Sequence, residues 1–377
     1  MAGADRIRRA GAVFAAACLL ALPAASATQE ETRSYDLQAG ASIRVSNPSG
    51  NIRISGWDQP RAEVRAVRRA GARGGPAPID VHAGPLSLEV RPVSDPRASE
   101  GVDFELKVPS GANVEQAVSA SGDVEVSGVR GRVSATSASG RVRVTETGAA
   151  TVRSASGSVT VTAAAEADIQ TASGAITAEK IRGALRATTS SSSITVVDVG
   201  GPAQLSASSG GISVVKAAGS VLARSISGPV EVSGGSGSVT ASSTSSGVKI
   251  AGARGHVEVR STSGELRIDD AAAEGVDARS TSGSVYYRGS LASGGRYELE
   301  TLSGGVTLVL PAVNCGFDLI AKTVSGVIET DFDIRAARTE VKGNTRRLEG
   351  VHGGGCARVR AISFSGSVRL RKDATLR

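Results

Sequence analysis

Serine and histidine are the residues of this chain that could support nucleophilic catalysis. Serine recurs in a tetrapeptide, [Ser/Thr]-x-Ser-Gly, but the three histidines, His82, His256 and His352, occur in none of its copies. A catalytic serine needs a base within hydrogen-bonding reach, so the pattern argues against a serine hydrolase. We therefore expect the serine hydroxyls to be structural.

Paired carboxylates beside Arg, Lys or a metal would indicate a polysaccharide hydrolase or lyase. The nearest such pair is Asp269-Asp270, but adjacent strand residues point to opposite faces, so we expect a solvated turn there. The run Gly353-Gly354-Gly355 lacks the Gly-Lys-[Ser/Thr] of a phosphate loop and predicts a tight turn. We expect no catalytic residue, no cofactor and no metal ligand, and hence no enzyme.

Residues 1–27 have the parts of an export signal, with a basic start, an apolar stretch and a cleavage site at Arg6–Arg9, Val13–Leu22 and Ala25–Ala27. The apolar stretch is too short to span a bilayer, which needs about 20 residues. Acylation of Cys18 is the lipoprotein alternative. We expect an exported protein, periplasmic, surface-exposed or secreted, with no transmembrane span in the mature chain.

Two cysteines, Cys315 and Cys356, follow the predicted signal. An even pair in an exported protein is more often a disulfide than two free thiols, so we predict that they pair. Closing a loop of roughly 40 residues would stabilise the fold by about 4 kcal/mol on the chain-entropy model. Two buried free cysteines are the alternative.

The tetrapeptide is part of a longer repeat, because alternating apolar residues follow each copy and the step from Gly122 to Gly264 is 17 to 19 residues. Degenerate copies at Thr189–Ser192 and Ala207–Gly210 keep the phase. Glycine supplies the tight corner. The predicted corner glycines are Gly122, Gly140, Gly157, Gly174, Gly210, Gly228, Gly247, Gly264, Gly283, Gly304, Gly326 and Gly366.

Each repeat contains two short strands, since Val133 and Ala135 alternate with polar residues before Gly140, and Val142 and Val144 alternate after it. Ser137 and Ser139 have the same parity as Val133, which predicts hydroxyls that point inward or line the corner. We predict an all-β fold, a single-stack β-helix-like β-solenoid of coils of about 18 residues. An antiparallel meander is the alternative.

The ends differ from the middle of the chain. Prolines, charges and the single Trp57 gather in residues 28–118, for which we predict an N-terminal β-strand capping region, although Trp57 could also mark a ligand-stacking site. Residues 119–330 form the predicted Ser-Gly repeat solenoid. Residues 331–377 are expected to be an insertion followed by a C-terminal closing coil.

Composition limits the choice of partners. The net charge is +7, aromatic residues make up 3% of the chain, and basic residues are spread singly along the strands. Nucleic-acid binding is not expected, because basic patches flanked by aromatic residues are missing. The few aromatics and the short strands also argue against an outer-membrane barrel.

The segment Val45–Ile54, the strand Leu106–Pro109, the Ser-Gly-x-Val-x-Val repeats and the terminal Gly-Gly segment resemble a bacterial β-strand-repeat family of unknown function, whose adhesin label is itself an inference. The resemblance implies a β-solenoid-like fold at the cell envelope and carries over no site residue.

We expect a non-catalytic adhesin or scaffold that contacts an envelope or surface protein or a glycan. A polysaccharide-active β-helix enzyme is the alternative. A second alternative, an ice- or glycan-binding repeat protein, would need a uniform threonine ladder, whereas the outward positions at Arg141, Ser158, Ala175 and Glu265 vary.

Overall fold

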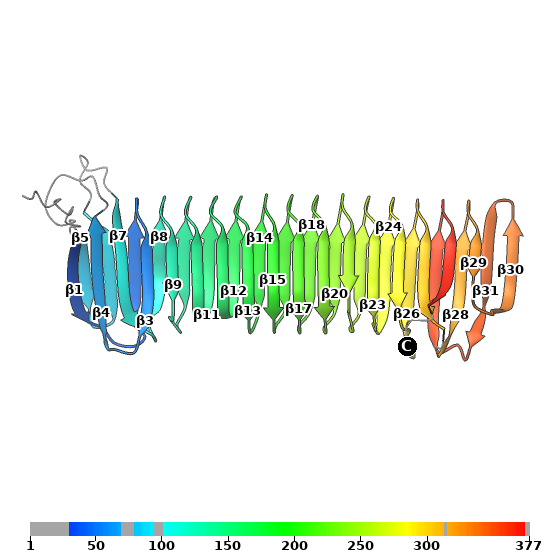
Figure 1. Ribbon diagram of the computed structural model, residues 1–377, viewed down its shortest axis with the longest axis horizontal. Helices are drawn as coiled ribbons and strands as arrows, with labels where there is room; N and C mark the ends of the chain where they lie inside the picture. The colour runs from blue at the N-terminus through cyan, green and yellow to red at the C-terminus, as the bar shows by residue number, and fades with distance from the viewer. Residues whose placement is uncertain (1–29, 69–78, 94–100, 313–314, 374–377) are drawn as a thin grey trace, which may run out of the picture.

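The computed structural model describes residues 30–68, 79–93, 101–312 and 315–373, so the predicted export signal lies outside the described residues. Its regular secondary structure there is β-strand throughout, β1 to β33, joined by hydrogen bonds into one extended sheet system. Figure 1 shows the strands side by side along the long axis of the molecule. The expectation of an all-β, repetitive architecture is confirmed.

Parallel strands form two faces of this stack. The first face contains β2 (Ser42–Asn47), β8 (Asn113–Ser119), β10 (Val133–Ser137), β14 (Leu185–Thr189), β16 (Ala203–Ala207), β18 (Val221–Ser225), β20 (Val239–Ser243), β22 (Val257–Ser261), β24 (Gly275–Ser280), β26 (Arg296–Thr301), β32 (Ala357–Ser363) and β28 (Gly316–Thr323). The second face contains β3 (Ile52–Trp57), β9 (Val124–Ser127), β13 (Ile176–Ile181), β15 (Ile194–Val199), β17 (Ile212–Ala217), β19 (Val230–Gly235), β21 (Val248–Ala251), β23 (Leu266–Ala271), β25 (Val285–Gly289), β27 (Val306–Pro311), β33 (Val368–Asp373) and β29 (Ile328–Thr330).

Two strands, β11 (Val142–Ser154) and β12 (Val159–Thr171), run from the second face into the first without interruption. In every repeat the chain leaves the first face through the tetrapeptide, which we call the Ser-Gly corner, and leaves the second face through a second corner. Each strand pairs with the equivalent strand of the next repeat, as Val159 does with Ile176 and Ile176 with Ile194.

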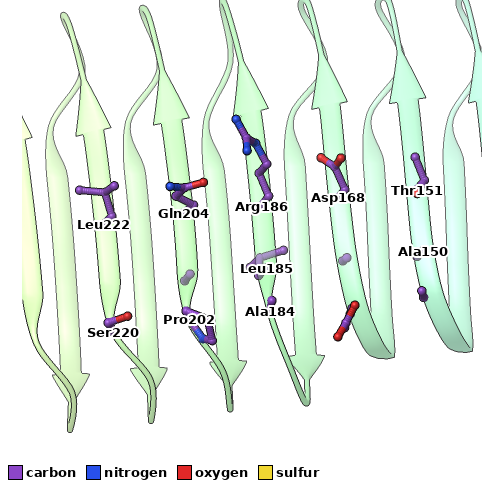
Figure 2. A pocket seen from close by; sticks show the side chains of 14 residues that line it. Ala150, Thr151, Asp168, Ala184, Leu185, Arg186, Pro202, Gln204, Ser220 and Leu222 are labelled. Carbon is purple, nitrogen blue, oxygen red and sulfur yellow. The ribbon is translucent and has the colours of Figure 1, made fainter.

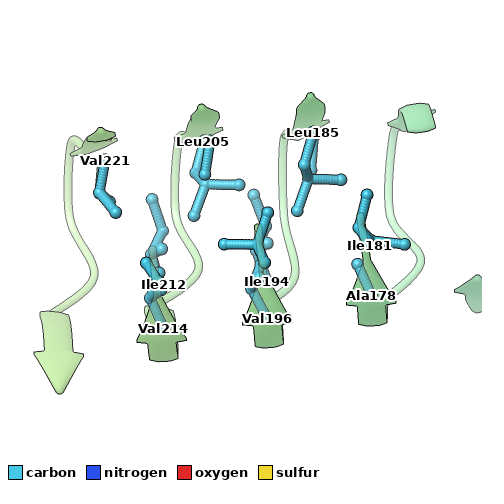
Figure 3. Close-up of a cluster of buried hydrophobic side chains, with 14 of the residues drawn as sticks. Ala178, Ile181, Leu185, Ile194, Val196, Leu205, Ile212, Val214 and Val221 are labelled. Atoms are coloured by element: carbon cyan, nitrogen blue, oxygen red, sulfur yellow. The ribbon is translucent and has the colours of Figure 1, made fainter. Parts of the chain in front are cut away.

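The core lies between the two faces. Leu185, Leu205 and Val221 from the first face point toward Ile194 and Ile212 of the second (Figure 3), and all five are buried. Aliphatic side chains of similar, modest size fill this narrow space evenly, and therefore one layer can be repeated along the stack. The low aromatic content has its explanation here.

Hydroxyl groups join successive repeats at the Ser-Gly corner. The Oγ of buried Ser137 donates a hydrogen bond to the carbonyl oxygen of Gly122 (3.1 Å) and accepts one from the N–H of Gly140 (2.9 Å). Ser119, Ser225 and Ser261 repeat this arrangement. Ser139, in contrast, is exposed in the turn, so only the first hydroxyl of the tetrapeptide is inward.

One predicted corner glycine is displaced. Ser243 makes the buried hydroxyl contact, donating to the carbonyl of Gly228 (2.9 Å), and Ser246 lies against Gly264 where a corner glycine would be expected. Gly247 is therefore one residue past the corner. With Ser246 in its place, the spacing from Gly174 to Gly264 is a constant 18 residues.

At the N-terminal end the order of strands in space departs from their order in sequence. Strands β2 and β3 pair directly with β8 and β9. The intervening chain turns outward and extends the end of the stack: β4 (Arg61–Arg68), β7 (Val102–Pro109) and β1 (Glu30–Asp36) on the second face, β6 (Ser87–Pro92) and β5 (Ile79–Gly84) on the first.

The C-terminal end is rearranged in the same way. Strand β32 pairs with both β26 and β28, and β33 with both β27 and β29, so the last strand pair lies inside the stack (Figure 1). The expected C-terminal closing coil is thus not terminal in space. The outermost position belongs to the antiparallel hairpin of β30 (Arg335–Lys342) and β31 (Thr345–Gly353), which pairs with β28.

A disulfide joins Cys315 and Cys356, as predicted. Cys315 precedes β28 and Cys356 precedes β32, two neighbouring strands. The bond therefore closes the excursion of the chain through β28 to β31. Phe317, Phe332 and His352 pack together at this end, with ring centroids 5.0 to 5.3 Å apart.

Candidate binding surface

The groups that could carry catalysis lie far from one another. His82 is exposed beside Asp80, with Nδ1 3.3 Å from the carboxylate. His256 is an exposed residue before β22, and His352 packs between Phe317 and Phe332. In the described part of the chain no group of three or more His, Cys, Asp or Glu side chains could hold a metal ion.

The carboxylates of Asp269 and Asp270 face different arginines. Asp269 accepts two hydrogen bonds from Arg267, at 2.6 and 3.1 Å, and Asp270 accepts one from Arg288 at 2.8 Å. The predicted turn at the glycine run is also present: Gly353 and Gly355 have φ values of 57° and 65° and lie between β31 and β32.

The second corner contains a column of left-handed residues that the sequence analysis missed. One residue per repeat has φ between 49° and 73°: Gly128, Glu146, Ala163, Lys180, Asp198, Lys216, Gly234, Gly252 and Asp270. Six of the nine are not glycine, so residue type gave no signal. Only the constant spacing in the sequence could have revealed the column.

Two shortened repeats hollow out this corner. From Val144 to Ala150, and again from Val161 to Ala167, the chain takes one residue fewer than from Val126 to Val133. The paired strands here are β11 and β12, which run straight through the corner. Because the neighbouring repeats keep the extra residue, their corners stand higher on either side.

The resulting depression, which we call the corner groove, has a volume of about 690 Å³. Gly128, Gly148 and Ala163 are its small residues, while Trp57 lies toward one end and Arg182 toward the other. Gly148 cannot carry a side chain, since a Cβ there would lie 2.4 Å from the carbonyl oxygen of Arg130. The charged lining residues are Asp58, Arg130, Glu146, Lys180 and Arg182.

Three of these charges are cations without a partner. Arg130, Lys180 and Arg182 are exposed and form no ion pair with any described residue. Elsewhere on the same corner, Lys216 pairs with Asp198 at 2.8 Å and Arg288 with Asp270 at 2.8 Å. The cations of the corner groove are therefore available to a ligand.

Trp57 is held in a fixed position. Its Nε1 donates a hydrogen bond to the carbonyl oxygen of Arg61 (2.7 Å), and Arg61 and Lys107 lie 5.3 and 5.6 Å from the ring centroid. The residue also belongs to β3, whose partner β7 extends the N-terminal end of the stack. Its ring can therefore act as a rigid wall of the groove.

A second groove lies beyond the same corner, on the first face (Figure 2). Thr151, Asp168, Arg186, Gln204 and Leu222 occupy equivalent outward positions on successive strands, and the groove has a volume of about 570 Å³. Carboxylate, guanidinium and amide groups in a row can bond to hydroxyl groups of a ligand. We call this the face groove.

The expected mixture of outward residues has to be corrected for the second face. Arg141, Ser158, Ala175 and Glu265 each precede a strand, and the outward positions on the strands come two residues later. There Thr160, Thr177 and Thr195 are in register. The row spans three repeats and is bounded by Arg143 on one side and Ser213 on the other.

The described residues contain no helix long and apolar enough to cross a membrane. The family model described as Toastrack DUF4097 matches residues 110–209 and 183–371. No curated protein matches the chain.

Solved structures similar to the chain include a provisionally named cell adhesion protein from Clostridium sporogenes, with 10% identity, coverage of 92% of this chain and 100% of that chain, and a TM-score of 0.17. A provisionally named adhesin from Parabacteroides distasonis has 12% identity, coverage of 75% and 98%, and a TM-score of 0.26. Another from Bacteroides fragilis has 14% identity, coverage of 90% and 96%, and a TM-score of 0.22. Scores this low support no conclusion about function.

Proposed function

The chain belongs to the Toastrack DUF4097 family, and from this premise we propose that it is a non-catalytic, exported β-solenoid that makes contacts at the cell envelope or cell surface. Its coils would be about 18 residues long. Residues 28–118 and 331–377 would cap the two ends, and residues 119–330 would form the binding rod.

The observation that carries this proposal is the pair of grooves at one corner of a continuous stack. Arg130, Lys180 and Arg182 in the corner groove, and Arg186 and Gln204 in the face groove, offer polar groups to a ligand along several repeats. A rigid stack holds such groups at fixed intervals, which favours extended ligands that make many weak contacts.

The alternatives lack comparable support. A polysaccharide-cleaving enzyme would need two carboxylates facing each other across a sugar-sized gap, and Asp269 and Asp270 face separate arginines. An ice-binding face would need threonine over many repeats. The second-face row covers Thr160, Thr177 and Thr195, and the neighbouring column contains Glu179 in the same region.

Binding of the purified mature protein to whole bacterial cells and to a glycan array tests the proposal. We expect saturable binding to cells or to immobilised glycans. The absence of binding to both would contradict a role in surface contacts. In a parallel incubation with acidic polysaccharides, new reducing ends would contradict the non-catalytic assignment.

A further inference from the structure

We propose that the corner groove binds an acidic oligosaccharide, with Arg130, Lys180 and Arg182 holding the carboxylates of its uronic acid residues. This inference names a ligand class for the surface contacts proposed above and rests on that proposed function. It applies to the corner groove alone.

Charge complementarity is the first argument. The groove presents three exposed cations with no ion-pair partner among the described residues, against the acidic side chains Asp58 and Glu146. Asp58 already accepts a hydrogen bond from the hydroxyl of Ser110 at 3.1 Å. Arg61, beside Trp57, adds a further positive charge at that end of the groove. Guanidinium groups bind carboxylates with two parallel hydrogen bonds, which favours an anionic ligand here.

The spacing of the cations is the second argument. Arg130 and the pair Lys180 and Arg182 are three repeats apart, about 14 Å at the usual distance between strands. The lowered corner between them bears small residues, so a ligand can lie along the stack and reach both ends. A single small anion would contact only one end, whereas an oligosaccharide with regularly spaced carboxylates would contact both.

The groove is unsuited to the usual modes of peptide binding. Strand addition requires a free sheet edge, but β11 pairs with β9 and β10 on one side and with β12 on the other, and β12 also pairs with β13 and β14. Helix docking requires a broad apolar groove, and the floor consists of Gly128, Gly148 and Ala163. A shallow polar trough with one aromatic wall is better matched to a sugar chain.

Calorimetric titration with a short oligogalacturonate tests the inference, with a maltooligosaccharide of equal length as the neutral probe and an oligoglutamate as the acidic peptide probe. We expect the mature protein to bind oligogalacturonate, more weakly at high salt, and to bind neither of the other probes comparably. The double variant Arg130→Ala/Arg182→Ala should bind at least about tenfold more weakly.

The matched control is Arg224→Ala/Arg254→Ala, which also removes two exposed arginines. Arg254 occupies the position of Arg182 four repeats later, outside the groove. This control should bind within about twofold of the unmodified protein, with an equal unfolding midpoint. A second variant, Ala163→Glu, adds a carboxylate to the groove at the position where Glu146 is tolerated one repeat earlier, and should also weaken binding.

Three results would overturn the inference: no binding of oligogalacturonate, equal affinity of the Arg130→Ala/Arg182→Ala variant, or tighter binding of oligoglutamate. The whole-cell assay separates this inference from the proposed function. If the double variant still binds cells as the unmodified protein does, only the assignment of the groove fails. If the unmodified protein binds no cells and no glycans, the proposed function fails.

Discussion

A Cβ atom on Gly140 would lie 2.0 Å from the carbonyl oxygen of Gly122, the glycine at the same corner one repeat earlier. Gly140 has no positive φ, so it is required by the close approach of the two backbones rather than by its own conformation. Ser137 completes the contact, because its hydroxyl bonds to both glycines. The Ser-Gly tetrapeptide is therefore the junction between successive repeats.

Substituting Gly140 with alanine should lower the free energy of unfolding by about 3 kcal/mol, because the new methyl group has to displace the backbone of the neighbouring repeat. Urea unfolding monitored by circular dichroism measures the change. Gly111→Ala is the control, since a Cβ at Gly111 would meet its nearest neighbour, the Cβ of Ala39, at an ordinary 3.5 Å. Equal midpoints for the two variants would contradict the proposed backbone contact.

Gly234 belongs to the other class of glycine, with φ of 73° and no atom closer than 3.7 Å to a Cβ. Gly234→Ala should cost about 1 kcal/mol through the left-handed conformation alone. At the equivalent position Ala163 has φ of 57°, so Ala163→Gly should stabilise the protein by about 0.5 kcal/mol, less than the full conformational term because glycine is more flexible when unfolded. Thermal unfolding of both variants should give shifts of opposite sign, and shifts of the same sign would refute this account.

Thr147 contains a buried hydroxyl without a hydrogen-bond partner in the described structure. The residue takes the inward position after the left-handed residue, where Val129 and Ile181 are found in other repeats. Replacement by valine keeps the shape and removes the unpaired group, so Thr147→Val should raise the free energy of unfolding by about 1 kcal/mol. Thr160→Val, at an outward position, should change it by less than about 0.5 kcal/mol. An unchanged or lowered midpoint for Thr147→Val would show that the hydroxyl has a partner in solution.

The repeating part of the fold was predictable because its causes are local. Alternation at Val133 and Ala135 assigns the inward face, and the recurrence of the tetrapeptide fixes the phase. Gly247 was assigned wrongly because the buried hydroxyl of Ser243, rather than the glycine, sets the phase of that corner. The corner groove was missed since a repeat shortened by one residue has no unusual residue type to mark it.

The order of strands at the ends was not predictable from local patterns. The segment Val368–Leu370 alternates like every other repeat, and its sequence does not show that β33 pairs between β27 and β29 instead of beyond them. That choice depends on contacts between segments about 60 residues apart, such as Val306 with Val368. The same limitation applies to β2 and β3 at the N-terminal end.

The disulfide should protect the outermost strands more than the inserted pair. Strand β32 is held on both sides, by β26 and β28, whereas β28 has only β32 and the terminal hairpin. Without the bond between Cys315 and Cys356, the unfolded excursion gains chain entropy, which corresponds to about 4 kcal/mol for a loop of this length. In the Cys315→Ala/Cys356→Ala variant, amide hydrogen exchange should therefore accelerate strongly at Leu319 and Ala321 of β28 and much less at Val359 and Ala361 of β32. Uniform acceleration in both strands would mean that the C-terminal end unfolds as one unit, and no acceleration would mean that the hairpin is held without the bond.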